Sequence, residues 1–402
     1  MGTSSVTARP ERAPALRPAR HRAQRGPWFR RPPGVLRALA VFAAVRLTGV
    51  AAVALMDHRA GRRLSVTLMH SWDSKWYLSI ARYGYGHHWR ESARGLQQTD
   101  WAFFPLYPGL IRAVHTVLPL SFGAAALLVA WSAALAAGYG VYAVVHRVYG
   151  RAVATVTVAL WAMLPHSVVL TLAYTEALFC ALAAWTLYAL LTSRWLLAGA
   201  LSALAGLTRP SGFAVAAAVL AVAAREVVRG RGRAPLAVWA GALLAPAGWA
   251  GYVLWVGART GDLLHGYFRV QAAWDSRIDL GLQEFRFLRT LFLHGGKVGY
   301  PMALVIVAAA VLLFALLCLD RPPLALFVYA GALVALVVLA SGPFGSKPRL
   351  LLPAFPLLIP MARAMVRGWW QRRGQVLAVA TALGAVSLLY GAYLVVLAKQ
   401  AL

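Results

Sequence analysis

The sequence predicts an all-α protein that crosses a membrane many times. Hydrophobic residues make up 60% of the 402 residues and charged residues only 13%, whereas soluble domains carry about a quarter charged residues. Long apolar runs recur from residue 35 to the C-terminus, many of them near the roughly 20 residues that a spanning helix needs. Backbone amides in hydrocarbon must bond within their own segment, so we expect these runs to be helices.

The chain carries a formal net charge of +28. In a soluble protein such a charge would suggest a nucleic-acid partner. Here the arginines cluster between the apolar runs, while the aromatic residues lie within them. This distribution is typical of the positive-inside rule and of attraction to anionic lipids. We therefore expect membrane lipids as partners and no nucleic acid.

Charge and hydropathy divide the chain into a tail and one membrane domain. Residues 1–35 are rich in Arg, Pro and Ala and predict a disordered, basic cytoplasmic tail. Residues 36–402 predict a single domain with about eleven spans. The predicted spans are 36–56, 122–145, 152–170, 176–191, 195–207, 213–224, 236–256, 302–319, 324–340, 350–365 and 376–397. The pair 195–207 and 213–224 is short and basic at both ends, which predicts a hairpin whose turn faces outward.

Two long polar segments, residues 57–120 and 257–297, interrupt the apolar runs. Counting the spans between basic clusters places both segments on the extracytoplasmic side, since long loops translocate regardless of their charge. Nine of the twelve carboxylates fall on that side. They are Asp57, Asp73, Glu91, Asp100, Glu176, Asp262, Asp275, Asp279 and Glu284. We expect the two extracytoplasmic loops to carry the functional site.

Two carboxylates stand out. Asp73 lies among Trp72, Trp76 and Tyr77, which is typical either of an interfacial aromatic belt around a solvated carboxylate or of a sugar platform beside a catalytic base. Glu176 begins the fourth predicted span, where an ionised carboxylate must face a polar cavity or a partner because exposure to lipid is costly.

Three cationic residues also map to the outer side: Arg209 in the hairpin turn, and Lys347 and Arg349 where the tenth span begins. They are consistent with side chains that reach for the interface or with a phosphate site. Together with Asp73 they favour attack on a donor whose sugar is linked to a lipid phosphate. A base would deprotonate the acceptor hydroxyl while cations stabilise the departing phosphate.

The sequence predicts no cofactor. His87 and His88, with Asp73 or Glu91, are a weak candidate for a divalent metal site. Adjacent histidines rarely point the same way on a helix, because successive side chains project from different faces.

Four short motifs, in order along the chain, resemble the PIG-V family of GPI mannosyltransferase 2-type enzymes. The first pair is Trp72-Asp73-x-x-x-Tyr77-x-x-Ile80-Ala81-x-x-Gly84-Tyr85 with Ala102-Phe103-Phe104-Pro105. The others are Leu164-Pro165 with Ala173-Tyr174-Thr175-Glu176-Ala177-Leu178-Phe179, then Thr208-Arg209-Pro210-Ser211-Gly212, and Lys347-Pro348-Arg349-Leu350 to Pro356. Thr175 stands where the family usually has serine, and the last motif matches more loosely.

The resemblance implies a GT-C glycosyltransferase fold with a long first extracytoplasmic loop. It also implies inverting transfer of mannose from a polyprenyl- or dolichyl-phosphate donor to a glycolipid, lipoglycan or protein hydroxyl. Asp73 is then the general base, and Glu176 orients the acceptor or a nearby cation. Arg209 and Arg349, with Lys347, hold the donor phosphate. Trp72, Trp76, Tyr77 and Tyr174 shape the sugar and acceptor site.

The composition is rich in Ala, Arg, Gly and Val, which favours a GC-rich genome and hence a bacterial plasma membrane; a eukaryotic chain would lie in the endoplasmic reticulum. Two other functions fit the composition: a transporter or lipid flippase, and a non-catalytic subunit of an envelope-assembly complex. Transporters usually show repeats and polar residues at the midplane, whereas this sequence shows neither.

Overall fold

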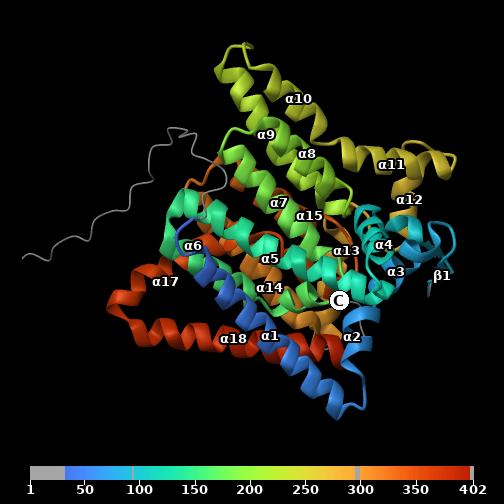
Figure 1. The fold of residues 1–402 in the computed structure, drawn as a ribbon, viewed down its shortest axis with the longest axis horizontal. Helices are drawn as coiled ribbons and strands as arrows, with labels where there is room; N and C mark the ends of the chain where they lie inside the picture. Colours follow the sequence, from blue (N-terminus) through green and yellow to red (C-terminus); the bar gives the residue numbers. More distant parts are fainter. Residues whose placement is uncertain (1–31, 93–94, 295–298, 399–402) are drawn as a thin grey trace, which may run out of the picture.

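The computed structural model describes residues 32–398 except 93–94 and 295–298. Most of the predicted tail, residues 1–35, therefore lies outside the described residues. The described chain is predominantly helical, as predicted (Figure 1). One antiparallel β-hairpin is added within the first polar segment, formed by β1 (Trp89–Glu91) and β2 (Gln97–Thr99) with Trp89 opposite Thr99.

Six helical segments of the described chain are long and apolar enough to cross a membrane, which indicates an integral membrane protein. They are α1 (Val35–Arg59), α5 (Phe122–Tyr149), α9 (Phe213–Arg229) with the preceding turn η3 (Pro210–Gly212), α10 (Leu236–Leu244) continued by α11 (Ala247–Arg259), α14 (Gly299–Leu319) and α18 (Arg373–Val396). Pro246 separates α10 from α11, because a proline cannot donate a backbone bond inside a helix.

Two further predicted spans are bent. Helix α6 (Arg151–Ala162) meets η2 (Pro165–Thr171) at 83°. Leu164 is extended (ψ 142°), since the residue before a proline is displaced from the helical region. The second bend, of 80°, joins η4 (Phe344–Ser346) and α16 (Lys347–Leu350) to η5 (Phe355–Leu358) and α17 (Ile359–Gln371).

The remaining predicted spans are the short apolar helices α7 (Glu176–Leu191), α8 (Trp195–Gly206) and α15 (Leu324–Leu339). Each predicted apolar run thus contains a helix or a broken helix. The count of eleven crossings is not confirmed, because at most eight described segments meet the length for spanning even when each bent pair counts as one.

Small residues bring the helices together. A Cβ added to Gly199 of α8 would lie 2.5 Å from the carbonyl oxygen of Gly241 in α10, and one added to Gly140 of α5 would lie 2.9 Å from Ala184 of α7. Such contacts suit helices that associate by close packing rather than by the hydrophobic effect. In Figure 1, α5 and α7 lie in the middle of the molecule, with α10 at one end and α18 at the other.

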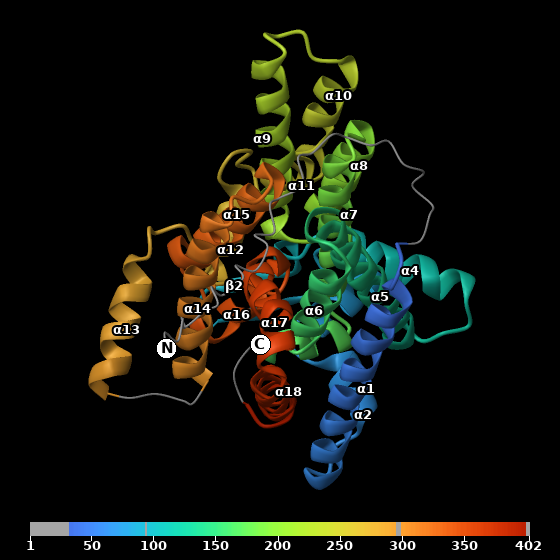
Figure 2. The same ribbon diagram turned by 90° about the vertical axis from the view of Figure 1, so that its left-hand side faces the viewer.

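The two polar segments fold against each other. The first contains α2 (Leu64–His70), α3 (Ser74–Tyr83), the β-hairpin, η1 (Asp100–Ala102) and α4 (Leu106–Val117); the second contains α12 (Gly266–Ala273) and α13 (Leu282–His294). The side chains of Gln98, Gln271 and Trp274 donate hydrogen bonds to carbonyls of the other segment, over 3.1 to 3.3 Å. Helix α12 is thereby held against the first segment, whereas α13 lies at the edge of the molecule (Figure 2), where Phe287 packs on Tyr300 and Phe344.

Candidate functional site

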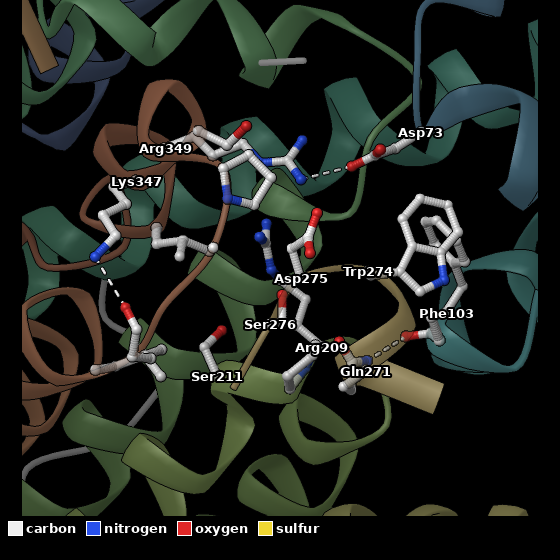
Figure 3. Close-up of a pocket in the computed structure, with 18 of the residues that line it drawn as sticks. Asp73, Phe103, Arg209, Ser211, Gln271, Trp274, Asp275, Ser276, Lys347 and Arg349 are labelled. Atoms are coloured by element: carbon white, nitrogen blue, oxygen red, sulfur yellow. Dashed lines mark hydrogen bonds and ion pairs between the residues drawn. The ribbon is translucent and has the colours of Figure 1, made fainter. Parts of the chain in front are cut away.

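A cavity of about 320 Å³ lies where the two polar segments meet the helix ends. Five parts of the chain line it: α3 and the residue before it, the β-hairpin with residues 102–104, the turn between α8 and α9, α12 with the residues after it, and residues 336–350. Figure 3 shows Asp73, Arg209, Asp275 and Arg349 around this space. A polar cavity among apolar helices is a typical place for a binding or catalytic site.

A chain of ion pairs joins two carboxylates and two guanidinium groups along the cavity. Arg349 Nη2 lies 2.7 Å from Asp73 Oδ2, and Arg349 Nε lies 3.7 Å from Glu176 Oε1. The same Glu176 oxygen lies 2.5 Å from Arg209 Nη1. The structure therefore brings together Asp73, Glu176, Arg209 and Arg349, all of which were predicted from their outward placement.

Exposure decreases along this chain from Asp73 to Glu176. The side chain of Asp73 is 21% exposed and that of Arg349 16%, whereas Arg209 is 8% and Glu176 2% exposed. Asp73 is thus the member that a molecule in the cavity reaches most easily. Glu176 lies deepest, between two arginines, where its charge offsets theirs. Among the described residues, neither Nε nor Nη1 of Arg349 has a hydrogen-bond partner, so part of the guanidinium remains available to a ligand.

Local sequence fixes each member. Asp73 sits in the turn that starts α3, and its carbonyl accepts hydrogen bonds from the amides of Trp76 and Tyr77 at 3.0 and 3.2 Å. Arg209 is extended (φ −157°, ψ 157°), as expected before a proline. Glu176 begins α7, where a negative charge interacts favourably with the helix dipole.

The predicted aromatic residues divide into two groups. Tyr77 lines the cavity, and its hydroxyl lies 3.3 Å from Thr175 Oγ1. Burial, with the nearby charge of Asp73, raises the pKa of the Tyr77 phenol well above its usual range. Trp72 does not line the cavity; its side chain is 37% exposed and its backbone left-handed (φ 40°).

Trp76 and Tyr174 lie behind the cavity wall. Trp76 stacks on Phe103 at 5.4 Å between ring centroids and meets Trp274 edge-on at 5.0 Å, so it supports two rings that line the cavity. Tyr174 is fully buried, and the Arg349 guanidinium lies over its ring at 5.7 Å. Both therefore support the cavity's residues and do not line it.

Lys347 lines the cavity, but its ammonium group is engaged by the backbone. Nζ donates to the carbonyls of Val337 and Ala340 at 2.7 and 2.8 Å. These carbonyls lie at the C-terminal end of α15, where the helix dipole favours a cation. The Lys347 side chain thus connects the start of α16 to the end of α15, and its charge remains beside the cavity.

The histidine pair does not form a cluster. His88 packs edge-on against Trp76 at 4.4 Å, while His87 Nδ1 lies 3.1 Å from the carbonyl of Tyr85. Within the described ranges, no group of three or more His, Cys, Asp or Glu side chains is arranged to hold a metal ion.

Sequence reasoning missed one wall of the cavity. Gln98, Gln271, Trp274 and Asp275 all line it. A signal was present: the triplet Trp274-Asp275-Ser276 repeats Trp72-Asp73-Ser74. Both triplets reach this region from different loops, although only the first belongs to a predicted motif.

Comparison with known proteins identifies the fold. No family model and no curated protein matches the chain. Among solved structures it resembles the archaeal oligosaccharyltransferase AglB from Archaeoglobus fulgidus in complex with an inhibitory peptide and a dolichol-phosphate. The TM-score is 0.53 at 14% identity over 91% of this chain and 56% of that chain.

Other structures of that enzyme agree. The form tethered to an acceptor peptide with an NVT sequon gives a TM-score of 0.51 at 13% identity, over 91% of this chain and 56% of that one. The complex with zinc and sulfate gives 0.52 at 15% identity, over 90% and 54%. This chain thus spans a little over half the length of the enzyme. It is a polytopic membrane protein whose fold resembles that of the oligosaccharyltransferase.

Proposed function

We propose that this protein is an inverting glycosyltransferase that moves mannose from a polyprenyl- or dolichyl-phosphate donor to a hydroxyl group. The observation that carries the proposal is the chain Asp73–Arg349–Glu176–Arg209 beside a cavity. It supplies an accessible carboxylate and two fixed guanidinium groups in one place. Mannose as the transferred sugar rests on the resemblance of the sequence motifs to the PIG-V family.

Asp73 is the general base in this proposal. Its carboxylate accepts the proton of the acceptor hydroxyl as the oxygen attacks the anomeric carbon. The new bond forms on the face opposite the phosphate, and the bond between the anomeric carbon and the phosphate oxygen breaks. The electron pair leaves with the lipid phosphate, so configuration at the sugar carbon inverts.

Arg349 and Arg209 stabilise the leaving phosphate. Its negative charge rises as the glycosidic bond breaks, and fixed cations in a site of low dielectric stabilise such developing charge strongly. Arg349 has an unused donor at Nη1 in the described chain, and an arginine fork suits phosphate geometry. Lys347 adds charge beside the cavity while it holds the end of α15.

The fold neighbour supports the use of a lipid phosphate, since one of its structures contains a dolichol-phosphate together with an inhibitory peptide. We propose that transfer occurs on the outer face of the membrane, as the distribution of basic residues predicts, and that this membrane is a bacterial plasma membrane, as the composition favours. The acceptor is then a glycolipid, a lipoglycan or a protein hydroxyl.

The test compares Asp73→Asn with the wild type in membranes supplied with radiolabelled polyprenyl-phosphate-mannose. Loss of the base is expected to lower transfer by about 100- to 10,000-fold. Asp262→Asn is the matched control, because Asp262 pairs with Arg269 at 3.1 Å in the second polar segment and does not line the cavity. Transfer by Asp73→Asn at the wild-type rate contradicts the proposal. Movement of the donor across the membrane without transfer supports a flippase instead.

A further inference from the structure

We propose that Trp274 and Asp275 form the subsite for the sugar ring, with Asp275 accepting hydrogen bonds from sugar hydroxyls and Trp274 facing the apolar side of the ring. This inference rests on the proposed glycosyltransferase function and adds a substrate-binding wall to it. Both residues are half-buried and line the cavity. Figure 3 shows Asp275 pointing into the same space as Arg209.

The backbone of Asp275 has a conformation that usually belongs to glycine. Its φ is 61°, and it directly follows Trp274, the C-terminal cap of α12. The amide of Asp275 donates to the Ala272 carbonyl at 3.1 Å and that of Ser276 to the Gln271 carbonyl at 3.0 Å. These two bonds define a Schellman cap, in which the left-handed position is most often glycine. Asp275 therefore occupies a position that the helix cap fixes, and its carboxylate belongs to the cavity wall.

Ser341, in the segment that follows α15, holds this turn by hydrogen bonds. Its amide donates to the Arg277 carbonyl at 2.7 Å, and its hydroxyl accepts from the Arg277 amide at 3.2 Å. The Ser341 hydroxyl also lies 3.3 Å from the Asp275 carbonyl. Ile278 and Ala340 continue the contact as a β-bridge. The carboxylate is thus carried by backbone fixed on both sides, as a specific binding group requires.

Trp274 is fixed as well. Its ring meets those of Trp76 and Phe103 edge-on at 5.0 and 5.3 Å, and its Nε1 donates to the Thr99 carbonyl at 3.3 Å. Arg90 lies over the ring at 5.6 Å and donates to Gln98 Oε1. The indole is therefore held as a rigid aromatic surface beside the Asp275 carboxylate.

These two groups match a sugar better than a phosphate. A carboxylate repels a phosphate but accepts hydrogen bonds from hydroxyls. A hexose presents hydroxyls at its edge and C–H bonds on its face, and an aromatic ring provides a matching apolar surface. In this arrangement the arginines bind the phosphate, and Asp73 accepts the proton of the attacking hydroxyl. The wall formed by Trp274 and Asp275 binds the sugar between them.

The experiment uses Asp275→Gly, which suits the left-handed backbone and keeps the cap, and Asp275→Asn, which keeps the shape of the side chain. Transfer is measured with polyprenyl-phosphate-mannose and with analogues that each lack one sugar hydroxyl. We expect kcat/KM with the full donor to fall about 10- to 100-fold in both variants. At least one deoxy analogue should lose about that factor in the wild type and much less in the variants. The thermal midpoint of each variant is measured as well, so that a loss of transfer caused by unfolding is recognised.

Two outcomes overturn this inference while the proposed function stands: Asp275→Gly transferring at the wild-type rate, or every deoxy analogue losing the same factor in wild type and variants. Asp279→Asn is the matched control, since Asp279 accepts from the amides of Gly281 and Gln283 at the start of α13 and does not line the cavity. Absence of transfer by the wild type from any polyprenyl-phosphate hexose is a different result and overturns the proposed function together with the subsite.

Discussion

Arg349 and Asp73 are 276 positions apart in sequence, yet the guanidinium Nη2 of one lies 2.7 Å from the carboxylate Oδ2 of the other. The same guanidinium reaches back toward Glu176. Arg349 therefore couples the partly exposed carboxylate of Asp73 to the buried carboxylate of Glu176. Its planar fork is suited to two simultaneous contacts, which a lysine ammonium cannot reproduce in the same geometry.

Replacing Arg349 with lysine should consequently impair transfer while preserving the charge. We expect kcat to fall by about 100-fold or more, since losing a positioned donor at a developing charge costs about that factor. The rate is measured at saturating donor in membranes. Arg269→Lys, at an exposed ion pair away from the cavity, is the control. An unchanged kcat for Arg349→Lys would remove Arg349 from the mechanism.

The pair Glu176–Arg209 should determine stability more than any exposed pair. Glu176→Gln removes the carboxylate that pairs with the buried Arg209. We therefore expect the free energy of unfolding to fall by about 3 kcal/mol. Adding Arg209→Gln should restore part of that loss, because the uncompensated charge is then gone. Thermal unfolding in detergent measures both effects. Additive losses in the double variant would show that the two side chains are not coupled.

Tyr77 should not titrate in the working range of the protein. Burial and the charge of Asp73 raise the pKa of its phenol, so the neutral form persists from about pH 6 to pH 9. Tyr77→Phe should therefore leave the shape of the pH–rate profile unchanged over that range. Because the folded state retains the proton that the unfolded state loses above about pH 10, Tyr77 contributes stability that is lost as the pH rises past that point. A basic limb that disappears in Tyr77→Phe would contradict this assignment.

Glycine packing offers a prediction independent of function. Gly199→Ala places a methyl group 2.5 Å from the carbonyl oxygen of Gly241, so we expect a loss of about 1 to 3 kcal/mol. Gly251 lies in α11 with no heavy atom within 4 Å of an added Cβ. Gly251→Ala should be neutral or stabilise by up to about 1 kcal/mol, because alanine favours the helix. Equal effects of the two substitutions on the thermal midpoint would argue against close packing of α8 and α10.

The sequence predicted where the helices and the charged residues lie better than it predicted which charged residues pair with one another. Long apolar runs and Lys/Arg clusters located the apolar helices. The cost of a charge in lipid predicted that Glu176 faces a polar cavity or a partner, and in the structure it pairs with Arg209. The pairing of each arginine with a carboxylate depends on tertiary contacts between residues that are far apart in sequence. Local sequence patterns do not predict such contacts. The break at Pro165 was marked by a proline, but its 83° angle was not.

Asp275 shows a second limit. Its role depends on a left-handed backbone at the end of α12, where glycine is the residue that sequence rules expect. Trp72 shows the converse: a residue in a family-like motif lies outside the cavity lining, although its neighbour Asp73 lies within it. Motif position therefore indicated a segment that reaches the cavity, and only the three-dimensional contacts separated the two side chains.

The most direct test of the central claim is the choice of donor. The purified protein is incubated with total membrane lipid and protein as acceptors, and with radiolabelled mannose supplied either as polyprenyl-phosphate-mannose or as GDP-mannose. A site of two arginines and a carboxylate facing a membrane cavity predicts transfer from the lipid-linked donor alone, abolished by Asp73→Asn. Transfer from GDP-mannose alone, or equal transfer with Asn at position 73, would contradict the account.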